Sequence, residues 1–171
     1  MKSMYQSIEQ FVSDWNQEAA LTLKVFEALS DASLKQAVSD TRPRTLGDLA
    51  WHVSGAPVGI LGGAGLQIAA PDFQRPVPAS AAEIADAYRS MSAAVADAIE
   101  AQWTDARLPE SLLLFGSMNM TYDAVLKLVV RHQIHHRGQM TILMRQAGVV
   151  PPGVYGPNEE EGAAIRAARG Q

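Results

Sequence analysis

The sequence contains no cysteine among its 171 residues. This absence excludes disulfides, iron–sulfur clusters, zinc sites built from thiolates and a cysteine nucleophile. It is compatible with a reducing compartment. Any thiol chemistry performed by this protein would need a thiol supplied by another molecule.

Long apolar runs are also absent. No stretch approaches the roughly 18 uninterrupted apolar residues of a membrane span, and the first nine residues hold one basic residue, Lys2, without the apolar core of a secretory signal. We therefore expect a soluble, cytoplasmic protein.

An excess of positive charge is likewise missing. Fourteen basic residues stand against eighteen acidic ones, which gives a formal net charge of −4, and the basic residues are scattered along the chain. The sequence thus lacks the cationic footprint of a protein that binds nucleic acid or anionic lipid. We expect a small-molecule partner, with no nucleic acid and no membrane.

Helix-type spacing of apolar residues dominates what is present, and strand-type alternation is nearly absent, which predicts an all-α protein. The length suits a single domain over residues 1–171. The first helix is predicted from about Met4 to Leu29. The second follows Thr45, a plausible N-cap, with Asp48 at the capping-box position. Pro57 and the glycines after it predict a kink or an early end of this helix.

Two further long helices and a short one are predicted in the second half of the chain. Ser80 is a good N-cap for the third helix, with Glu83 at the capping-box position. Residues 105–119 look irregular, with a short extended segment or a loop plug at 112–115. The longest helix runs from about Thr121 to Gln146. Gly148 occupies the expected left-handed C-cap position, and an extended crossing over residues 150–157 then leads to a short terminal helix that begins at 158.

All four histidines fall on two of the predicted helices, His52 on the second and His132, His135 and His136 on the fourth. His132 and His136 are four residues apart, so they share one helix face. Both belong to the predicted buried stripe of the fourth helix, which places them in the bundle interior. This stripe consists of Val125, Val129, His132, His136, Met140, Leu143 and Ala147.

Two neighbouring buried imidazoles are costly unless their ring nitrogens are satisfied, because an unpaired buried polar group costs roughly 1–3 kcal/mol. A divalent metal ion held by His132 and His136, with His52 as third ligand, would satisfy them. His135 points about 100° away around the helix, and we expect a second-shell or surface residue. The open alternative is a metal-free core in which the histidines are hydrogen-bonded.

Other candidate features carry less weight. Arg131, Arg137 and Arg145 are expected to be solvated or paired with carboxylates. The glycine run that ends at Gly65 lacks the lysine and hydroxyl of a phosphate-binding loop. The stretch 57–65 could instead shape a mouth to a site at His52, which is a hypothesis from position only.

Three segments together resemble the DinB/YfiT-like family, which is regarded as a family of metalloenzymes. They are Thr45–His52 (TLGDLAWH), Arg131–Met140 (RHQIHHRGQM), and Arg145–Gly148 (RQAG) followed by Pro152–Pro157 (PGVYGP). The resemblance implies a four-helix bundle with up-down-down-up connectivity, here with a short extra C-terminal helix, and commonly a homodimer. It also implies one nickel, zinc or similar ion on three histidines, which carry over onto His52, His132 and His136.

The resemblance also implies an activity. Relatives include transferases that join low-molecular-weight bacterial thiols to electrophiles, and a thiol-dependent isomerase. The first hypothesis is therefore a metal-dependent thiol S-transferase in which the ion activates the thiol. The alternatives are a metal-dependent hydrolase that uses metal-bound water, and a non-catalytic, stress-related module that binds a metal or another ligand.

Overall fold

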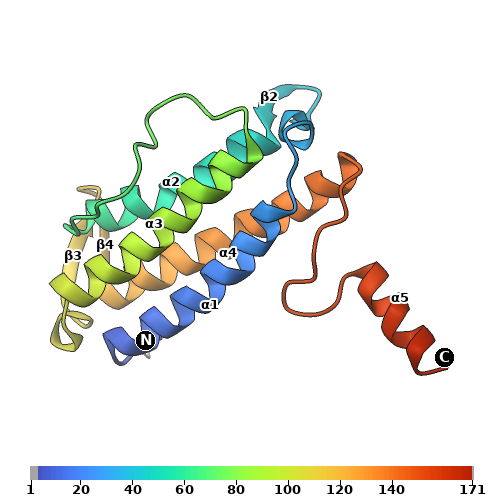
Figure 1. Cartoon of the computed structure of the whole chain (residues 1–171). Coiled ribbons are helices and arrows are strands. Elements are labelled where there is room, and N and C mark those ends of the chain that lie inside the picture. Colours follow the sequence, from blue (N-terminus) through green and yellow to red (C-terminus); the bar gives the residue numbers. More distant parts are fainter. Residues whose placement is uncertain (1–3, 171) are drawn as a thin grey trace.

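The structure, a computed structural model, describes residues 4–170 (Figure 1). Residues 1–3 and 171 lie outside the described residues, so the expectations for the first nine residues and for a domain over residues 1–171 fall partly outside them. The described chain is mostly helical, as predicted, and contains two small antiparallel hairpins. Its elements are α1 Ile8–Glu27, a 3-10 turn Ser33–Lys35, β1 Ala37–Ser39, β2 Arg42–Thr45, α2 Leu46–Gly63, α3 Ala81–Gln102, a 3-10 turn Asp105–Arg107, β3 Ser111–Leu114, β4 Met118–Thr121, α4 Tyr122–Gln146 and α5 Glu159–Ala168.

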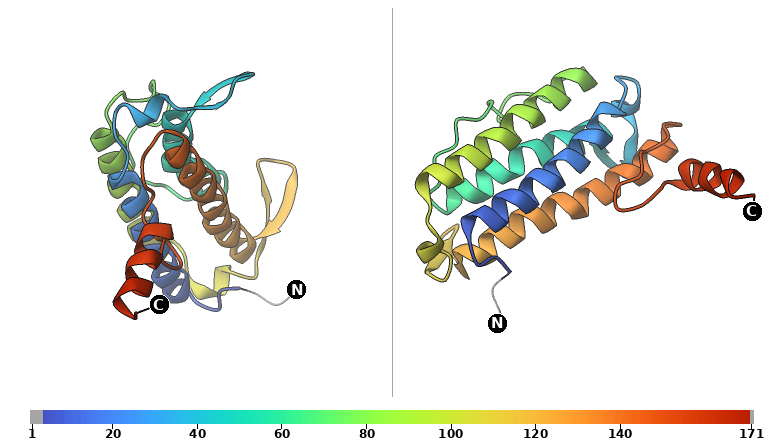
Figure 2. Two further views of the ribbon diagram at one scale, coloured as in Figure 1. Left: turned by 90° about the vertical axis from the view of Figure 1, so that its right-hand side faces the viewer. Right: turned by 60° about the horizontal axis from the view of Figure 1, so that its bottom comes forward.

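The four long helices lie side by side (Figures 1 and 2). The most extensive contacts join α1 to α3 and α2 to α4, and α2 also packs against α3. Asp31, just after α1, accepts a hydrogen bond from the backbone N–H of Ala81 at the start of α3, so α1 and α3 run in opposite directions. Gln67, just after α2, and Gln102 at the end of α3 exchange hydrogen bonds, so α2 and α3 run in the same direction. Helices α1 and α4 run together, opposite to both (Figure 1).

Side-chain caps fix the starts of α2, α3 and α4 close to where the sequence predicts them. The Thr45 hydroxyl accepts from the Asp48 N–H while the Asp48 carboxylate accepts from the Thr45 N–H, which completes a capping box. The hydroxyls of Ser80 and Thr121 cap α3 and α4. At the far end of α4, Gly148 has a φ of +75°, as expected for a left-handed C-cap.

Three boundaries differ from the prediction. Helix α1 begins at Ile8, later than the predicted Met4, and ends at Glu27. Of the kink or early end predicted for α2, the early end is wrong, since the helix continues through Pro57 to Gly63. Pro57 is buried, and packing of the surrounding helix against α3 and α4 offsets the missing backbone hydrogen bond.

The two hairpins occupy stretches of the sequence, 37–45 and 111–121, that lack a clear helical pattern of apolar residues. The segment at 111–114 is the extended alternative of the two predicted, and it forms β3. The hairpin of β1 and β2 was not predicted, because its residues are almost all exposed and so show no alternation of apolar and polar side chains.

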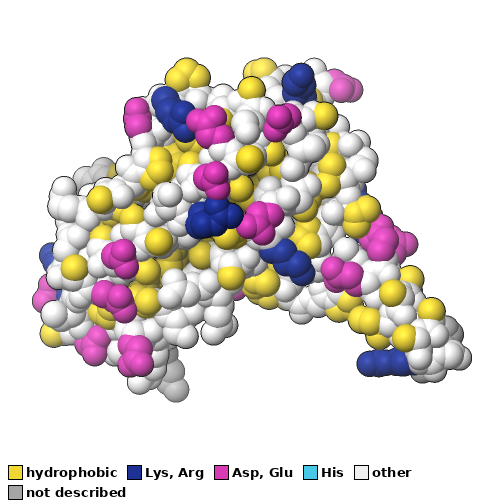
Figure 3. Space-filling model, in the orientation of Figure 1, with side chains coloured by type: hydrophobic (Ala, Val, Ile, Leu, Met, Phe, Trp, Pro, Cys, Tyr) yellow, Lys and Arg dark blue, Asp and Glu magenta, His cyan; other side chains and the backbone are white. Residues whose placement is uncertain are grey.

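The outside of the molecule carries acidic and basic side chains in an interspersed arrangement on the face shown in Figure 3, where no histidine is visible. Helix α5 stands apart from the long helices (Figures 1 and 2) and has no buried residue. Within residues 4–170, no helix combines the length and the apolar character needed to cross a membrane.

Candidate metal centre

Helices α2 and α4 bring together the three histidines that the sequence singles out. His52 comes from the middle of α2, and His132 and His136 come from successive turns of α4. Because the two helices pack against each other, the three imidazoles meet at the interface between them.

The ring nitrogens of the three histidines converge on one point. The Nε2 atom of His132 lies 3.1 Å from Nε2 of His52 and 3.2 Å from Nε2 of His136. All three candidate ligand atoms lie within 4.8 Å of one another. Nitrogen ligands at about 2.0–2.1 Å from a tetrahedral ion are roughly 3.4 Å apart. The arrangement therefore fits a single ion with little movement of the rings.

The expected burial of these histidines is wrong. His52 is exposed, and His132 and His136 are only partly buried. The core face of α4 is instead one residue further along, where Gln133 and Arg137 are 1% and 2% exposed. The histidines thus lie at the edge of the helix interface, where small molecules can reach them.

The electrostatic surroundings keep these imidazoles neutral. Burial, followed by the charges of neighbouring groups, lowers the pKa of His132 to about 4. Partial desolvation of the rings also lowers the pKa values of His52 and His136, and the positive charge of Arg44 acts on all three rings in the same direction. Neutral imidazoles have the free lone pairs that a metal ion requires.

Gln139 orients one of the rings. Its side-chain oxygen lies 2.7 Å from Nδ1 of His136, which suits donation by the Nδ1–H and leaves Nε2 of His136 unprotonated and directed at the other two rings. This partner was not predicted from the sequence. Its position three residues after His136 on the same helix face is the signal that could have found it.

His135 lies beside the cluster and does not join it. Its ring centroid is 4.9 Å from that of His136, but its side chain is exposed and it is not part of the convergent group. Of the two roles expected for this residue, the position fits the surface one.

Arg137, the residue after His136, is not solvated as one alternative expected but is paired with a carboxylate. Its guanidinium donates to the Glu18 carboxylate at 2.7 Å, to the Glu18 backbone carbonyl at 3.0 Å and to the Thr22 hydroxyl at 2.9 Å. It also donates to the Tyr155 hydroxyl, which in turn donates to Glu18. These contacts tie α4 at the histidine cluster both to α1 and to the chain that follows α4.

A cavity of about 330 Å³ adjoins the cluster. Gln139 belongs to its wall, and Leu49, one turn before His52, belongs to it as well. The proline- and glycine-containing stretch 57–65 contributes no residue to this cavity. It is lined by Val38, Arg44, Leu49, Gln139, Ile142, Leu143 and Gln146.

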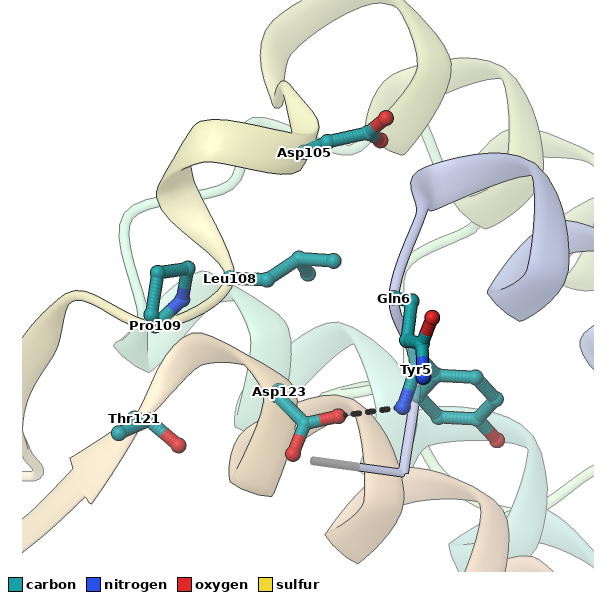
Figure 4. A pocket seen from close by; sticks show the side chains of 7 residues that line it. All are labelled: Tyr5, Gln6, Asp105, Leu108, Pro109, Thr121 and Asp123. Carbon is teal, nitrogen blue, oxygen red and sulfur yellow. Dashed lines mark hydrogen bonds between the residues drawn. The ribbon is translucent and has the colours of Figure 1, made fainter. Parts of the chain in front are cut away.

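A second cavity lies towards the other end of α4 (Figure 4). The two carboxylates that line this cavity accept hydrogen bonds from backbone N–H groups of the N-terminal segment. Asp123 accepts hydrogen bonds from the backbone N–H groups of Met4 and Tyr5, and Asp105 accepts one from Ile8. Asp123 thus anchors the N-terminal segment to α4, and Asp105 anchors it to the 3-10 turn before β3. Asp123 lies about 13 Å along α4 from His132.

Comparison with known proteins gives a consistent result. A model of the DinB family matches residues 4–169. The uncharacterized protein YrdA of Bacillus subtilis (strain 168) is 43% identical over 160 residues, which cover 94% of this chain and 95% of that protein.

Two crystal structures are similar to this fold. A DinB-like protein from Bacillus cereus ATCC 10987 matches with a TM-score of 0.83 and 43% identity, over 89% of this chain and all of that one. A DinB-like protein of Bacillus subtilis, YjoA, matches with a TM-score of 0.64 over 87% of this chain and 99% of that one. At 18% identity, the second likeness concerns the fold alone.

Proposed function

This chain belongs to the DinB family, and on that premise we propose that it is a metal-dependent enzyme whose single divalent ion is held by His52, His132 and His136. The observation that carries the proposal is the convergence of three imidazole nitrogens within 4.8 Å. Three imidazoles suit nickel or zinc.

Hydrogen bonds among the three rings do not satisfy all three nitrogens. Because Nδ1 of His136 donates to Gln139, its Nε2 carries a lone pair. Nε2 of His132 is in contact with both of the other Nε2 atoms. If it carries a proton it donates to only one of them, and if it carries a lone pair it faces the lone pair of His136. A bound cation satisfies all three nitrogens at once, which supports a metal centre over a metal-free cluster.

We propose that the reaction is the transfer of a thiol to an electrophile. A bound divalent ion would lower the pKa of a thiol that reaches it and so favour the reactive thiolate. The chain's own residues would hold the site open, because exposed His52 leaves the outer side of the cluster accessible. Gln139 would keep His136 in the required tautomer. The absence of cysteine means that the thiol is a separate small molecule.

The test is a thiol-dependent turnover assay on protein loaded with nickel or zinc. Formation of a thioether from a small thiol and 1-chloro-2,4-dinitrobenzene, with release of chloride and of the thiol proton to solvent, should require the ion. It should disappear in His52→Ala and persist in His135→Ala. Turnover of 4-nitrophenyl acetate without thiol would instead favour a hydrolase. A protein that holds one ion per chain and performs neither reaction would favour a non-catalytic binding module.

We further propose that α1 to α4 form the up-down-down-up four-helix bundle implied by the resemblance, as one domain over residues 1–171. The relative directions of the helices and their contacts support this. The homodimer and the cytoplasmic location remain predictions. Light scattering on purified protein would test the first, and cell fractionation the second.

A further inference from the structure

The cavity beside the histidine cluster has an unusual composition for an acidic protein. The chain carries a net charge of −4, yet the only charged residue that lines this cavity is the cation Arg44. Within residues 4–170, Arg44 has no ion pair and no side-chain hydrogen bond. Strand β2 therefore presents an unpaired guanidinium to the cavity.

The rest of the wall is mainly apolar. Val38 and Ile142 are 43% and 61% exposed, which is high for aliphatic side chains, whereas Leu49 and Leu143 are buried. The side-chain amides of Gln139 and Gln146 are the remaining polar groups. This combination matches a small molecule with one anionic end and a short carbon chain.

The cavity and the histidine cluster are linked through a shared residue, Gln139. Gln139 lines the cavity and is also hydrogen-bonded to His136. Leu49 lies one turn from His52 on α2, and the charge of Arg44 is felt by all three histidines. A ligand in the cavity would thus have its anionic end at Arg44 and its other end near the ring nitrogens.

We propose that this cavity is the binding subsite for the acidic substrate, a short-chain thiol that bears a carboxylate. Arg44 pairs with the carboxylate, the exposed aliphatic side chains of Val38 and Ile142 contact the carbon chain, and the sulfur reaches the ion. The placement of the sulfur at the ion rests on the proposed function. The placement of the carboxylate at Arg44 rests on the cavity alone, so the two parts of the proposal can be tested separately.

The first experiment measures thiol affinity in cobalt-loaded protein through the thiolate-to-cobalt absorption band. The probes are 3-mercaptopropionate, neutral 2-mercaptoethanol and cationic cysteamine. An exposed ion pair changes an affinity by up to about fivefold. We therefore expect 3-mercaptopropionate to bind about three- to fivefold more tightly than 2-mercaptoethanol, and cysteamine to bind most weakly.

The matched variants are Arg44→Gln and Arg42→Gln, which remove a cation from the same strand. Arg44→Gln should abolish the preference for the acid, Arg44→Lys should retain most of it, and Arg42→Gln should leave it unchanged, because Arg42 does not line the cavity. Equal affinities for the three thiols, or equal effects of the two glutamine variants, would overturn the subsite while leaving the metal centre intact. Absence of the absorption band with every thiol would contradict the proposed function instead.

The second experiment needs no metal. Butyrate, which has the carboxylate and the carbon chain without the thiol, is titrated into metal-free protein labelled with nitrogen-15. The signals of the Arg44 Nε–H and the Gln139 side-chain amide should shift with butyrate and much less with 1-butanol. Unchanged signals with butyrate would overturn the subsite whatever the metal experiments show.

Discussion

The ion pair between Arg137 and Glu18 offers a sharp test of how α4 is held in place. Their side chains are 2% and 10% exposed, and the guanidinium lies 2.7 Å from the carboxylate. Arg137→Met keeps most of the aliphatic volume and removes the charge. It leaves the Glu18 carboxylate buried with one remaining side-chain donor, the Tyr155 hydroxyl.

The expected cost is large. Breaking a buried ion pair by removing one partner destabilises a protein by about 3–5 kcal/mol, because an uncompensated charge stays buried. That is a substantial part of the roughly 5–15 kcal/mol by which a domain is stable. The double variant Arg137→Met/Glu18→Leu removes both charges and should recover much of the loss, since replacing a buried pair by apolar groups is often neutral.

The assay is urea unfolding followed by circular dichroism at neutral pH, in the presence of a chelator so that metal binding does not add to the stability. The control is Arg145→Met, which breaks the exposed pair with Glu160 and should change the free energy of unfolding little. A loss in Arg137→Met no larger than that in Arg145→Met would refute the reasoning, as would a double variant less stable than either single one.

Two further predictions concern the histidine cluster. Gln139→Leu removes the acceptor of the His136 Nδ1–H and should weaken metal affinity about 10- to 100-fold in a competition titration with a chromophoric chelator. The control Gln146→Leu alters the same cavity wall but not this hydrogen bond, so it should leave metal affinity unchanged. Equal effects of the two variants would contradict the role of Gln139. In metal-free protein, stability should fall as the pH falls from about 6.5 to about 4, because the unfolded chain takes up a proton at His132 that the folded chain, with its lowered pKa, does not bind. In pH-dependent urea unfolding, His132→Asn should lose less stability than the wild type over this window, and identical curves would contradict the prediction.

The sequence identified the ligand candidates through spacing, but it misjudged their surroundings. An i, i+4 pair reports that His132 and His136 share a helix face, and the structure confirms that they do. Periodicity does not report whether that face is the core. The buried face of α4 includes Gln133 and Arg137, whose polar side chains resemble surface residues in a pattern of apolar positions. Only tertiary partners such as Glu18 reveal that Arg137 is buried.

The starts of α2 and α3 were predictable and the hairpins less so, for a physical reason. Caps such as Thr45 and Ser80 act within three residues, so a local pattern contains the whole interaction. The first hairpin has exposed residues on both strands and no alternation to detect. Arg44 belongs to this hairpin, and its place beside the histidines depends on how α2 and α4 pack, which no local pattern encodes.

The central claim is tested most directly by the metal content of the protein. Elemental analysis would be made on protein purified without an affinity tag and reconstituted with zinc or nickel, for the wild type and for folded His52→Ala, His132→Ala and His136→Ala variants. The matched control is His135→Ala, which removes a neighbouring imidazole outside the convergent group. About one ion per chain in the wild type and the control, and loss of the ion in the three variants, is the predicted result. No bound metal in the reconstituted wild type, or equal retention in all variants, would contradict the three-histidine centre.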